Sequence, residues 1–363
     1  GETWYWQGAT CSPSSTALGS AATFTASAVG TNTYYIASQN NQSWCWSACA
    51  SLTVTVDPMN TVSVTITAAP SLTICPGTSV TFTASPVNGG AGPVYQWKKN
   101  GVNVGSGGTT YSSAALVNGD VITCVLTSNV SCPSGNPATS NSMAMVVKSN
   151  IAGTNGIWNG QLDTDWGKTC NWDNGTIPTS IINVVIANTA FNHCILAGTG
   201  NGLNLTIQNT RTLTHSSGTL SVYGNFANDG AWAASAGTGT VSFTGSTAQT
   251  IGGTGGAITF NNLVINNTAT TTITLNKAIT VNGALTMTKG YLITTSGNIL
   301  SMIAGSSTTG TSALSFVDGP MTKEGTTAFI FPLGDGSRWA RIGIGAASPV
   351  VSNTFSAQYF GTP

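Results

Sequence analysis

Charged side chains are scarce in this chain. Asp, Glu, Lys and Arg make up 6% of its 363 residues, and the formal net charge is zero. Disordered chains combine low hydrophobicity with high net charge, so the composition of this neutral, 40% hydrophobic chain argues against disorder. Nucleic-acid binding needs clustered basic side chains, whereas the ten Lys and Arg residues are spread along the chain. We therefore expect no nucleic-acid partner.

Long apolar runs and helical periodicity are missing as well. No window approaches the ~18 apolar residues of a membrane-spanning helix, so we expect no membrane span. No long stretch carries apolar residues three and four apart, as an amphipathic helix would. No export signal is visible, and we expect both ends to continue in a longer protein.

Glycine and β-branched residues, by contrast, are abundant in this chain. The chain has 44 glycines and many Ser, Thr and Asn residues, while Val, Ile and Thr dominate its apolar runs. Such residues favour short strands joined by tight turns. The sequence therefore predicts an all-β protein.

The first two segments predict separate β modules. Residues 1–57 contain the alternating runs "TYYIASQN" and "SLTVTV", which predict a small module. Residues 58–149 contain a fuller set of strands, including "SVTFTAS" and "VITCVLTS". Trp97 in "YQWKKNG" takes the place of the core tryptophan of an immunoglobulin-like (Ig-like) sandwich, and Cys124 falls in the late strand that packs opposite it. We therefore expect two Ig-like β-sandwich modules.

Residues 150–312 have shorter strands and a repeat. "NLTI" from Asn204 recurs as "NLVI" from Asn262, and "SVYG" from Ser221 recurs as "TVNG" from Thr280. Each copy holds two or three strand-turn units of roughly 20 residues, the size of solenoid rungs. We predict a parallel β-solenoid here, with an antiparallel sandwich as the alternative. Residues 313–363 differ in composition and predict a terminal β module that caps the open end.

The order of these segments resembles that of a known group of proteins. "YWQGATC…SWCWSACASLTVTV" and "ICPGTSVTFTAS…VYQWKKNGVNVG" resemble Ig-like modules of large cell-surface adhesin-like proteins from Bacteroidota. "WNGQLDTDWGKTCNWDNGTIP" and "FVDGPMTKEGTTAFIFPLGDGSRWARIGI" resemble the segments that open and follow their β-solenoids. The resemblance implies an extracellular or bacterial cell-surface adhesin-like protein, secreted by a type IX system through a C-terminal signal.

The cysteines favour an oxidising, extracellular setting. None has the paired CxxC spacing of a zinc site, so disulfides are the better interpretation, with reduced cysteines of a cytosolic protein as the alternative. The pairings we expect are Cys11–Cys49, Cys75–Cys124 and Cys170–Cys194. Cys132 competes with Cys124 for Cys75. Cys45 and Cys132 otherwise stay unmatched, and they could bridge modules or chains.

The Trp-rich segment 158–178 is the one stretch that looks like a metal or catalytic site. Asp163 and Asp165 lie two apart, as at the start of a calcium loop, but Trp166 and Gly167 follow where further oxygen ligands would be needed. The competing interpretation is a structural cap, with buried tryptophans and aspartates in Asx-turns. We favour the cap and keep the two aspartates as weak metal candidates. No cofactor is implied.

The sequence offers few residues that could form a catalytic site. Paired carboxylates are needed for glycoside hydrolysis, and Asp229 is the sole acid between residues 180 and 312. His193 and His215 are expected on the surface or in turns. Four tryptophans in the first module are candidate contact residues for sugars or proteins: Trp4, Trp6, Trp44 and Trp46.

These observations predict a non-enzymatic, extracellular adhesin-like protein whose Ig-like spacers carry a solenoid for attachment to a glycan or protein surface. One alternative is a structural subunit of an extracellular filament, self-associating through strand edges or through Cys45 and Cys132. A second alternative is a carbohydrate-binding accessory region of a larger enzyme.

Overall fold

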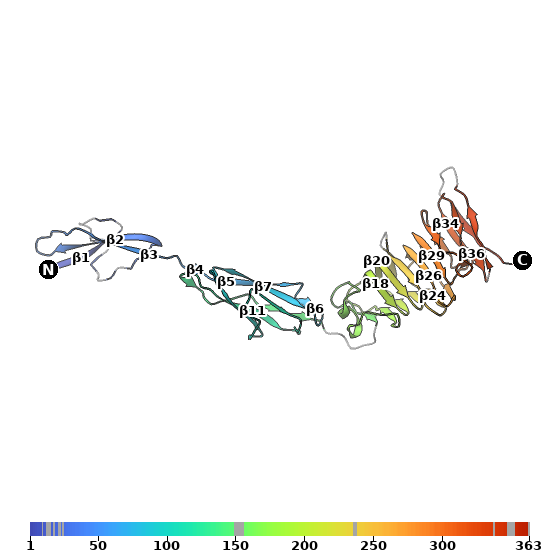
Figure 1. Cartoon of the computed structure of the whole chain (residues 1–363), viewed down its shortest axis with the longest axis horizontal. Coiled ribbons are helices and arrows are strands. Elements are labelled where there is room, and N and C mark those ends of the chain that lie inside the picture. Colours follow the sequence, from blue (N-terminus) through green and yellow to red (C-terminus); the bar gives the residue numbers. More distant parts are fainter. Residues whose placement is uncertain are drawn as a thin grey trace. The chain divides into compact units, whose positions relative to one another are not determined.

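The computed structural model has two compact units of β-structure (Figure 1). It describes residues 1–363 except 9, 12–15, 17–18, 21–22, 24, 149–155, 235–237, 337, 347–352 and 362–363, and the side chain of Asn174. One unit comprises Gly1–Leu72 with Ser79–Val146, and the other comprises Thr73–Thr78 with Val147–Pro363. In the described ranges, helix is limited to two short 3-10 turns, η1 (Thr169–Asn171) and η2 (Asp173–Gly175). None of the described helices is long and apolar enough to span a membrane.

The first module is a three-stranded antiparallel sheet in the order β1-β2-β3. Its strands are β1 (Glu2–Gly8), β2 (Gly30–Asn40) and β3 (Ala50–Val56). Because side chains alternate along a strand, the pairing of Tyr34 with Leu52 puts apolar residues on one face and threonines on the other. Cys11 and Cys49 form a disulfide in this module, as predicted from the sequence.

The second module has two main antiparallel sheets, consistent with an Ig-like sandwich. One sheet contains, in order, β10 (Thr110–Ser113), β7 (Val80–Val87) and β5 (Ser63–Ala69). The other contains β13 (Ala138–Thr139), β11 (Val121–Thr127), β8 (Val94–Lys99) and β9 (Val102–Val104), with β14 (Met143–Ala144) on β11. One short pair completes it, β4 (Asn60–Thr61) with β12 (Pro133–Ser134). A further short sheet pairs β6 (Thr73–Ile74) with β15 (Val146–Val147).

Trp97 is the fully buried centre of this sandwich. Its indole packs against Phe82 with ring centroids 6.4 Å apart and donates a hydrogen bond to the carbonyl of Gly108. Cys124 is also fully buried, but it pairs with Trp97 across neighbouring strands of one sheet and does not lie opposite it. The thiol is free, and burial raises its pKa to about 11.

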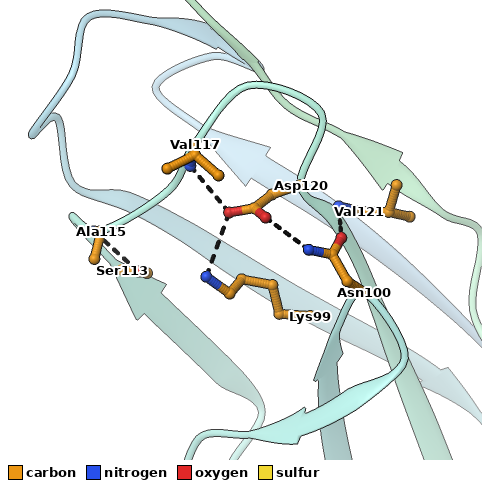
Figure 2. Close-up of polar contacts among 7 residues, drawn as sticks. All are labelled: Lys99, Asn100, Ser113, Ala115, Val117, Asp120 and Val121. Carbon is orange, nitrogen blue, oxygen red and sulfur yellow. Dashed lines mark hydrogen bonds and ion pairs between the residues drawn. The ribbon is translucent and has the colours of Figure 1, made fainter.

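A buried carboxylate holds one corner of the same module, as Figure 2 shows. Asp120 accepts hydrogen bonds from the backbone N–H of Val117 and from Asn100 Nδ2, and it lies 3.4 Å from Lys99 Nζ. Burial alone would raise the pKa of Asp120, but these hydrogen bonds and the Lys99 charge outweigh it and lower the pKa. Asn100 in turn accepts from the N–H of Val121, which ties the corner to β11.

The second unit is a parallel β-solenoid of about seven turns. Its longest sheet is parallel except for its last pair and contains, in order, β16 (Ile157–Trp158), β17 (Val184–Ile186), β19 (Leu205–Ile207), β21 (Phe226–Asn228), β24 (Gln249–Gly252), β27 (Thr272–Leu275), β30 (Tyr291–Ile293), β33 (Val317–Asp318), β36 (Leu333–Asp335) and β37 (Arg338–Trp339). We call it the long sheet.

Two further sheets run along the solenoid, and successive strands lie side by side in Figure 1. The sheet that we call the middle sheet contains β18 (Cys194–Gly202), β20 (Thr212–Val222), β23 (Thr240–Phe243), β26 (Asn262–Asn266), β29 (Ala284–Lys289) and β32 (Ser307–Thr309), with β22 (Ala231–Ala234) on β20. The short sheet contains β25 (Ile258–Phe260), β28 (Ile279–Val281), β31 (Leu300–Met302), β34 (Met321–Glu324) and β39 (Thr354–Ala357). A hairpin pairs β35 (Phe329–Phe331) with β38 (Ile342–Ile344).

The sequence repeat does not mark equivalent faces of the solenoid. "NLTI" contributes β19 to the long sheet, whereas "NLVI" forms β26 of the middle sheet. Both runs place two large apolar residues inward, as at Leu205 and Ile207. A strand on any face of the solenoid needs such inward apolar residues. The repeat therefore reflects the pattern of a buried strand, not the length of a turn.

The solenoid continues into the segment assigned from the sequence to a terminal module. Val317 of β33 pairs in parallel with Leu292, and Met321 of β34 pairs in parallel with Leu300. The antiparallel strands come later: β39 pairs with β34, and β37 pairs with β36. The last strand of the short sheet, β39, therefore runs antiparallel to its neighbour.

Two of the expected disulfides are wrong. Cys75 is bonded to Cys170, so neither Cys75–Cys124 nor Cys170–Cys194 forms. Cys124 and Cys194 point into separate apolar cores, where each is held by its strand register, and both stay reduced and buried. Burial and the nearby Asp165 charge raise the pKa of the Cys194 thiol. Cys45 and Cys132 are free and exposed.

Candidate attachment surfaces

The Trp-rich segment forms a closed apolar cluster. Trp158, Trp166 and Trp172 are buried, and Trp172 meets the other two rings edge to face, with centroids 5.0 and 4.6 Å apart. The indole N–H of Trp172 donates to the carbonyl of Trp166, and that of Trp158 donates to the carbonyl of Asn192. The indole N–H of Trp166 is buried and has no hydrogen-bond partner among the described residues. The three buried rings pack the first rung of the solenoid and offer no ring face to a ligand.

The two aspartates serve the turns of this segment. Asp163 Oδ1 accepts from the backbone N–H of Asp165 and from Asn171 Nδ2, at 2.9 and 2.8 Å. Asp165 Oδ1 accepts from the N–H of Gly167. The fully buried Asn171 also accepts from the N–H groups of Leu162 and Asp163. The contacts of Asp163 and Asp165 with the N–H groups two residues ahead are Asx-turns. No cluster of three metal-ligand side chains occurs in the described part of the chain.

Asn171 is the residue that the sequence did not single out. It lies between Cys170 and Trp172 and carries no periodic signal, so nothing in the local pattern marks it as the centre of the turn. Its amide makes four hydrogen bonds at once, which is the full capacity of the side chain.

The same segment covers a strand edge that would otherwise be exposed. The N–H of Trp166 donates to the carbonyl of Ile195 in β18, and the N–H of Ile195 donates to the carbonyl of Thr164. The first strand of the middle sheet is therefore paired on its outer side. The segment 158–178 acts as a lid over the start of the solenoid.

Polar side chains form columns on the outside of the solenoid. Each column arises because parallel pairing in register sets equivalent residues of successive turns side by side, about 4.8 Å apart. On the short sheet the column consists entirely of hydroxyl residues, namely Thr259, Thr280, Ser301 and Thr322 on parallel strands and Ser356 on the antiparallel β39. The hydroxyls of Thr322 and Ser301 lie 3.0 Å apart.

Two neighbouring columns run along the middle sheet. The first contains Thr199, Thr219, Thr240, Asn262, Ala284 and Ser307. The second contains Asn201, Ser221, Ser242, Val264, Thr286 and Thr309. None of these residues is charged. Ala284 and Val264 each interrupt one column with an apolar side chain. The other positions present short hydrogen-bonding groups, an arrangement suited to many weak contacts with an extended polar partner.

The charged residues of the solenoid are engaged by its own backbone. Asp229 accepts from the N–H and the hydroxyl of Thr254, and Arg211 donates twice to the carbonyl of Asn188. Lys277 and Lys289 donate to backbone carbonyls in the same way. Each of these groups joins one turn to the next. Between residues 180 and 312 they make no pair of carboxylates.

The two histidines occupy different environments. His193 is exposed, as expected, but His215 is almost fully buried inside the solenoid, with its ring 5.7 Å from that of Trp232. The expectation of a surface position was wrong because His215 falls on an inward position of β20, paired with Leu196. Burial lowers the pKa of His215, so the neutral imidazole is favoured.

The candidate contact tryptophans of the first module divide into two pairs. Trp4 is 51% exposed and Trp44 is 71% exposed, so both rings are open to a partner. Trp44 follows β2 in a turn that the side chain of Asn40 stabilises by accepting the N–H groups of Gln42 and Ser43. Trp46 packs against Tyr5 at 5.3 Å, and Trp6 lines a groove on the apolar face of the sheet.

Comparisons with known proteins add little to this description. No family model matches the chain, and no curated protein matches it. A solved structure described as "Structural basis for Dscam isoform specificity" is similar over 40% of this chain and 38% of that chain, with 14% sequence identity and a TM-score of 0.20. This chain therefore spans less than half of that one, and the likeness is too weak to carry an argument.

Proposed function

We propose that this chain is a non-enzymatic, adhesin-like protein of the extracellular space or the bacterial cell surface. The observation that carries the proposal is the set of uncharged columns on the short and middle sheets. Uncharged hydroxyl and amide groups exchange hydrogen bonds with water for those with a partner at little desolvation cost per contact, so attachment grows with the number of contacts. The partner is a glycan or protein surface.

The cysteines support the extracellular location. The Cys11–Cys49 and Cys75–Cys170 disulfides persist where the surroundings are oxidising, as outside the cell. The resemblance to Bacteroidota surface proteins gives the same location and adds type IX secretion. In this proposal the Ig-like modules are spacers and the solenoid carries the attachment surface.

Two other functions are supported by particular observations. The exposed rings of Trp4 and Trp44 suit stacking on sugars, which favours a carbohydrate-binding accessory region of a larger enzyme. The outer edge of β3, beside which no other described strand lies, and the free Cys45 and Cys132 favour self-association, as in a filament subunit.

Binding assays on the intact chain test the proposal. We expect retention on insoluble polysaccharides or on a glycan array, and we expect Thr280→Lys to weaken it because a long charged side chain interrupts the column on the short sheet. Thr206→Lys, at an outward position of the long sheet, is the matched control. If retention depends instead on Trp44, Trp44→Ala abolishes it and Thr280→Lys does not, which would favour the accessory-region alternative. Absence of binding to every glycan and surface protein tried would contradict attachment.

A further inference from the structure

The third strand of the first module is an unprotected sheet edge. β3 pairs with β2 on one side, and on its other side its described backbone makes no hydrogen bond within the chain. The strand has seven residues, "ASLTVTV", with no charge and no proline. Edge strands of natural sheets usually carry a lysine, a proline or a bulge that blocks pairing with another chain. β3 has no lysine or proline, and its pairing with β2 is regular throughout.

The solenoid of the same chain closes such edges. Thr164–Trp166 pairs with the outer side of β18, and β39 pairs with the outer side of β34. Two dedicated segments therefore cover strand edges in one unit, whereas β3 presents its backbone to solvent. The contrast indicates that the exposed edge of β3 is available for pairing.

The two faces of β3 differ and determine what would fit beside it. On one face the hydroxyls of Thr53 and Thr55 lie 3.4 and 3.0 Å from those of Thr33 and Thr31 on β2. On the other face, Leu52, Val54 and Val56 line an apolar groove of about 380 Å³ together with Trp6 and Tyr34. Leu52 remains exposed. A partner strand must therefore bring hydroxyls to one face and apolar side chains to the other.

We propose that the partner is β3 of a second copy, paired antiparallel about a two-fold axis at Thr53. In that register Thr53 meets Thr53, Ser51 meets Thr55 and Leu52 meets Val54, so both faces continue across the junction. Threonine pairs and aliphatic pairs of this kind stabilise antiparallel strands. A two-fold contact uses the same patch on both copies, which a strand with this alternation can satisfy.

No charge opposes the pairing. The nearest ionisable residue, Asp57, falls opposite Cys49 in this register and so does not face its own counterpart. The apolar grooves of the two copies become continuous, and the two exposed Leu52 side chains are covered. The proposal specifies the surface for the self-association considered above, and it does not depend on glycan attachment.

Sedimentation velocity of the full chain across a wide concentration range tests the pairing. The measurements use a chain with Cys45→Ser and Cys132→Ser, so that intermolecular disulfides produce no dimer. We expect a reversible dimer in this background. Thr53→Lys and Thr53→Glu should each give a monomer, because two like charges then meet on the axis, and their mixture should restore the dimer.

Thr31→Lys is the matched control, since Thr31 is exposed on the same threonine face but lies on the central strand. Hydrogen exchange gives a second readout, in which the amides of β3 become protected as concentration rises. A monomer at every concentration, a dimer that survives Thr53→Lys, or a mixture that stays monomeric would each overturn the proposal. Lack of glycan binding would leave it standing, and a monomer would leave attachment standing.

Discussion

At the scale of single residues, Asp120 shows how a buried charge is held in a chain that has few charges. Its carboxylate has three partners, and we expect Asp120→Asn to lower the free energy of unfolding of the Ig-like module by about 1–3 kcal/mol. Hydrogen exchange of the amides of β8 and β11 at increasing urea concentration measures the loss. Asp57→Asn, at an exposed position, should change little.

The lowered pKa of Asp120 also makes the stability of the Ig-like module depend on pH. A carboxyl group whose pKa falls on folding stabilises the fold above about pH 4, and this contribution is lost as the pH falls through the folded-state pKa. The difference between the native chain and Asp120→Asn should therefore shrink in acid. A difference that stays constant would rule out the charge as its cause.

His215 gives a second pH dependence, in the solenoid. Because burial lowers its pKa, the unfolded chain takes up a proton first as the pH falls below about 6.5. Its contribution to stability is thus complete above that value and lost progressively below it. We expect the solenoid to weaken between neutral pH and about pH 5, and His215→Leu to reduce that slope. Denaturant midpoints at several pH values, with His193→Leu as the exposed control, measure the effect.

At the scale of elements, the lid 158–178 depends on one amide. Asn171→Ala removes four hydrogen bonds and leaves the half-buried N–H groups of Leu162 and Asp163 unpaired, so we expect the lid to lose about 2–4 kcal/mol. Hydrogen exchange should increase at Leu162 and Ile195 before the later rungs open. Asn201→Ala, on an outward column, is the control, and equal exchange in the two variants would show that the lid does not depend on Asn171.

The strands themselves could be predicted because their pattern is local. Alternating residues such as Leu205 and Ile207 identify a half-buried strand whichever sheet it joins. The same locality misled the interpretation of the repeat, since identical patterns serve different faces. The columns of hydroxyls could not be predicted for the same reason. They depend on which residues of successive turns pair with one another, and the pattern of a single strand does not contain that information.

At the scale of the whole molecule, the fold class could be predicted and the long-range pairings could not. The many glycines and β-branched residues, with no helical periodicity, predicted an all-β chain, and the short strand-turn units predicted the parallel solenoid. Cys170, by contrast, has a nearby sequence partner in Cys194 but bonds to the distant Cys75. Cys194 lies on an inward position of β18 and is part of the solenoid core, so its thiol is not available to Cys170. Asn171 shares this limit, because its four partners converge only after the lid has folded.

The solenoid is closed by dissimilar means at its two ends, a tryptophan lid at one and reversed strands at the other. Each turn between them contacts only the turns beside it. Turns could therefore be gained or lost by duplication or deletion in the gene without rebuilding either closure. The number of turns is thus free to vary among descendants of this chain, and the reach of the polar columns would lengthen or shorten by one strand spacing each time.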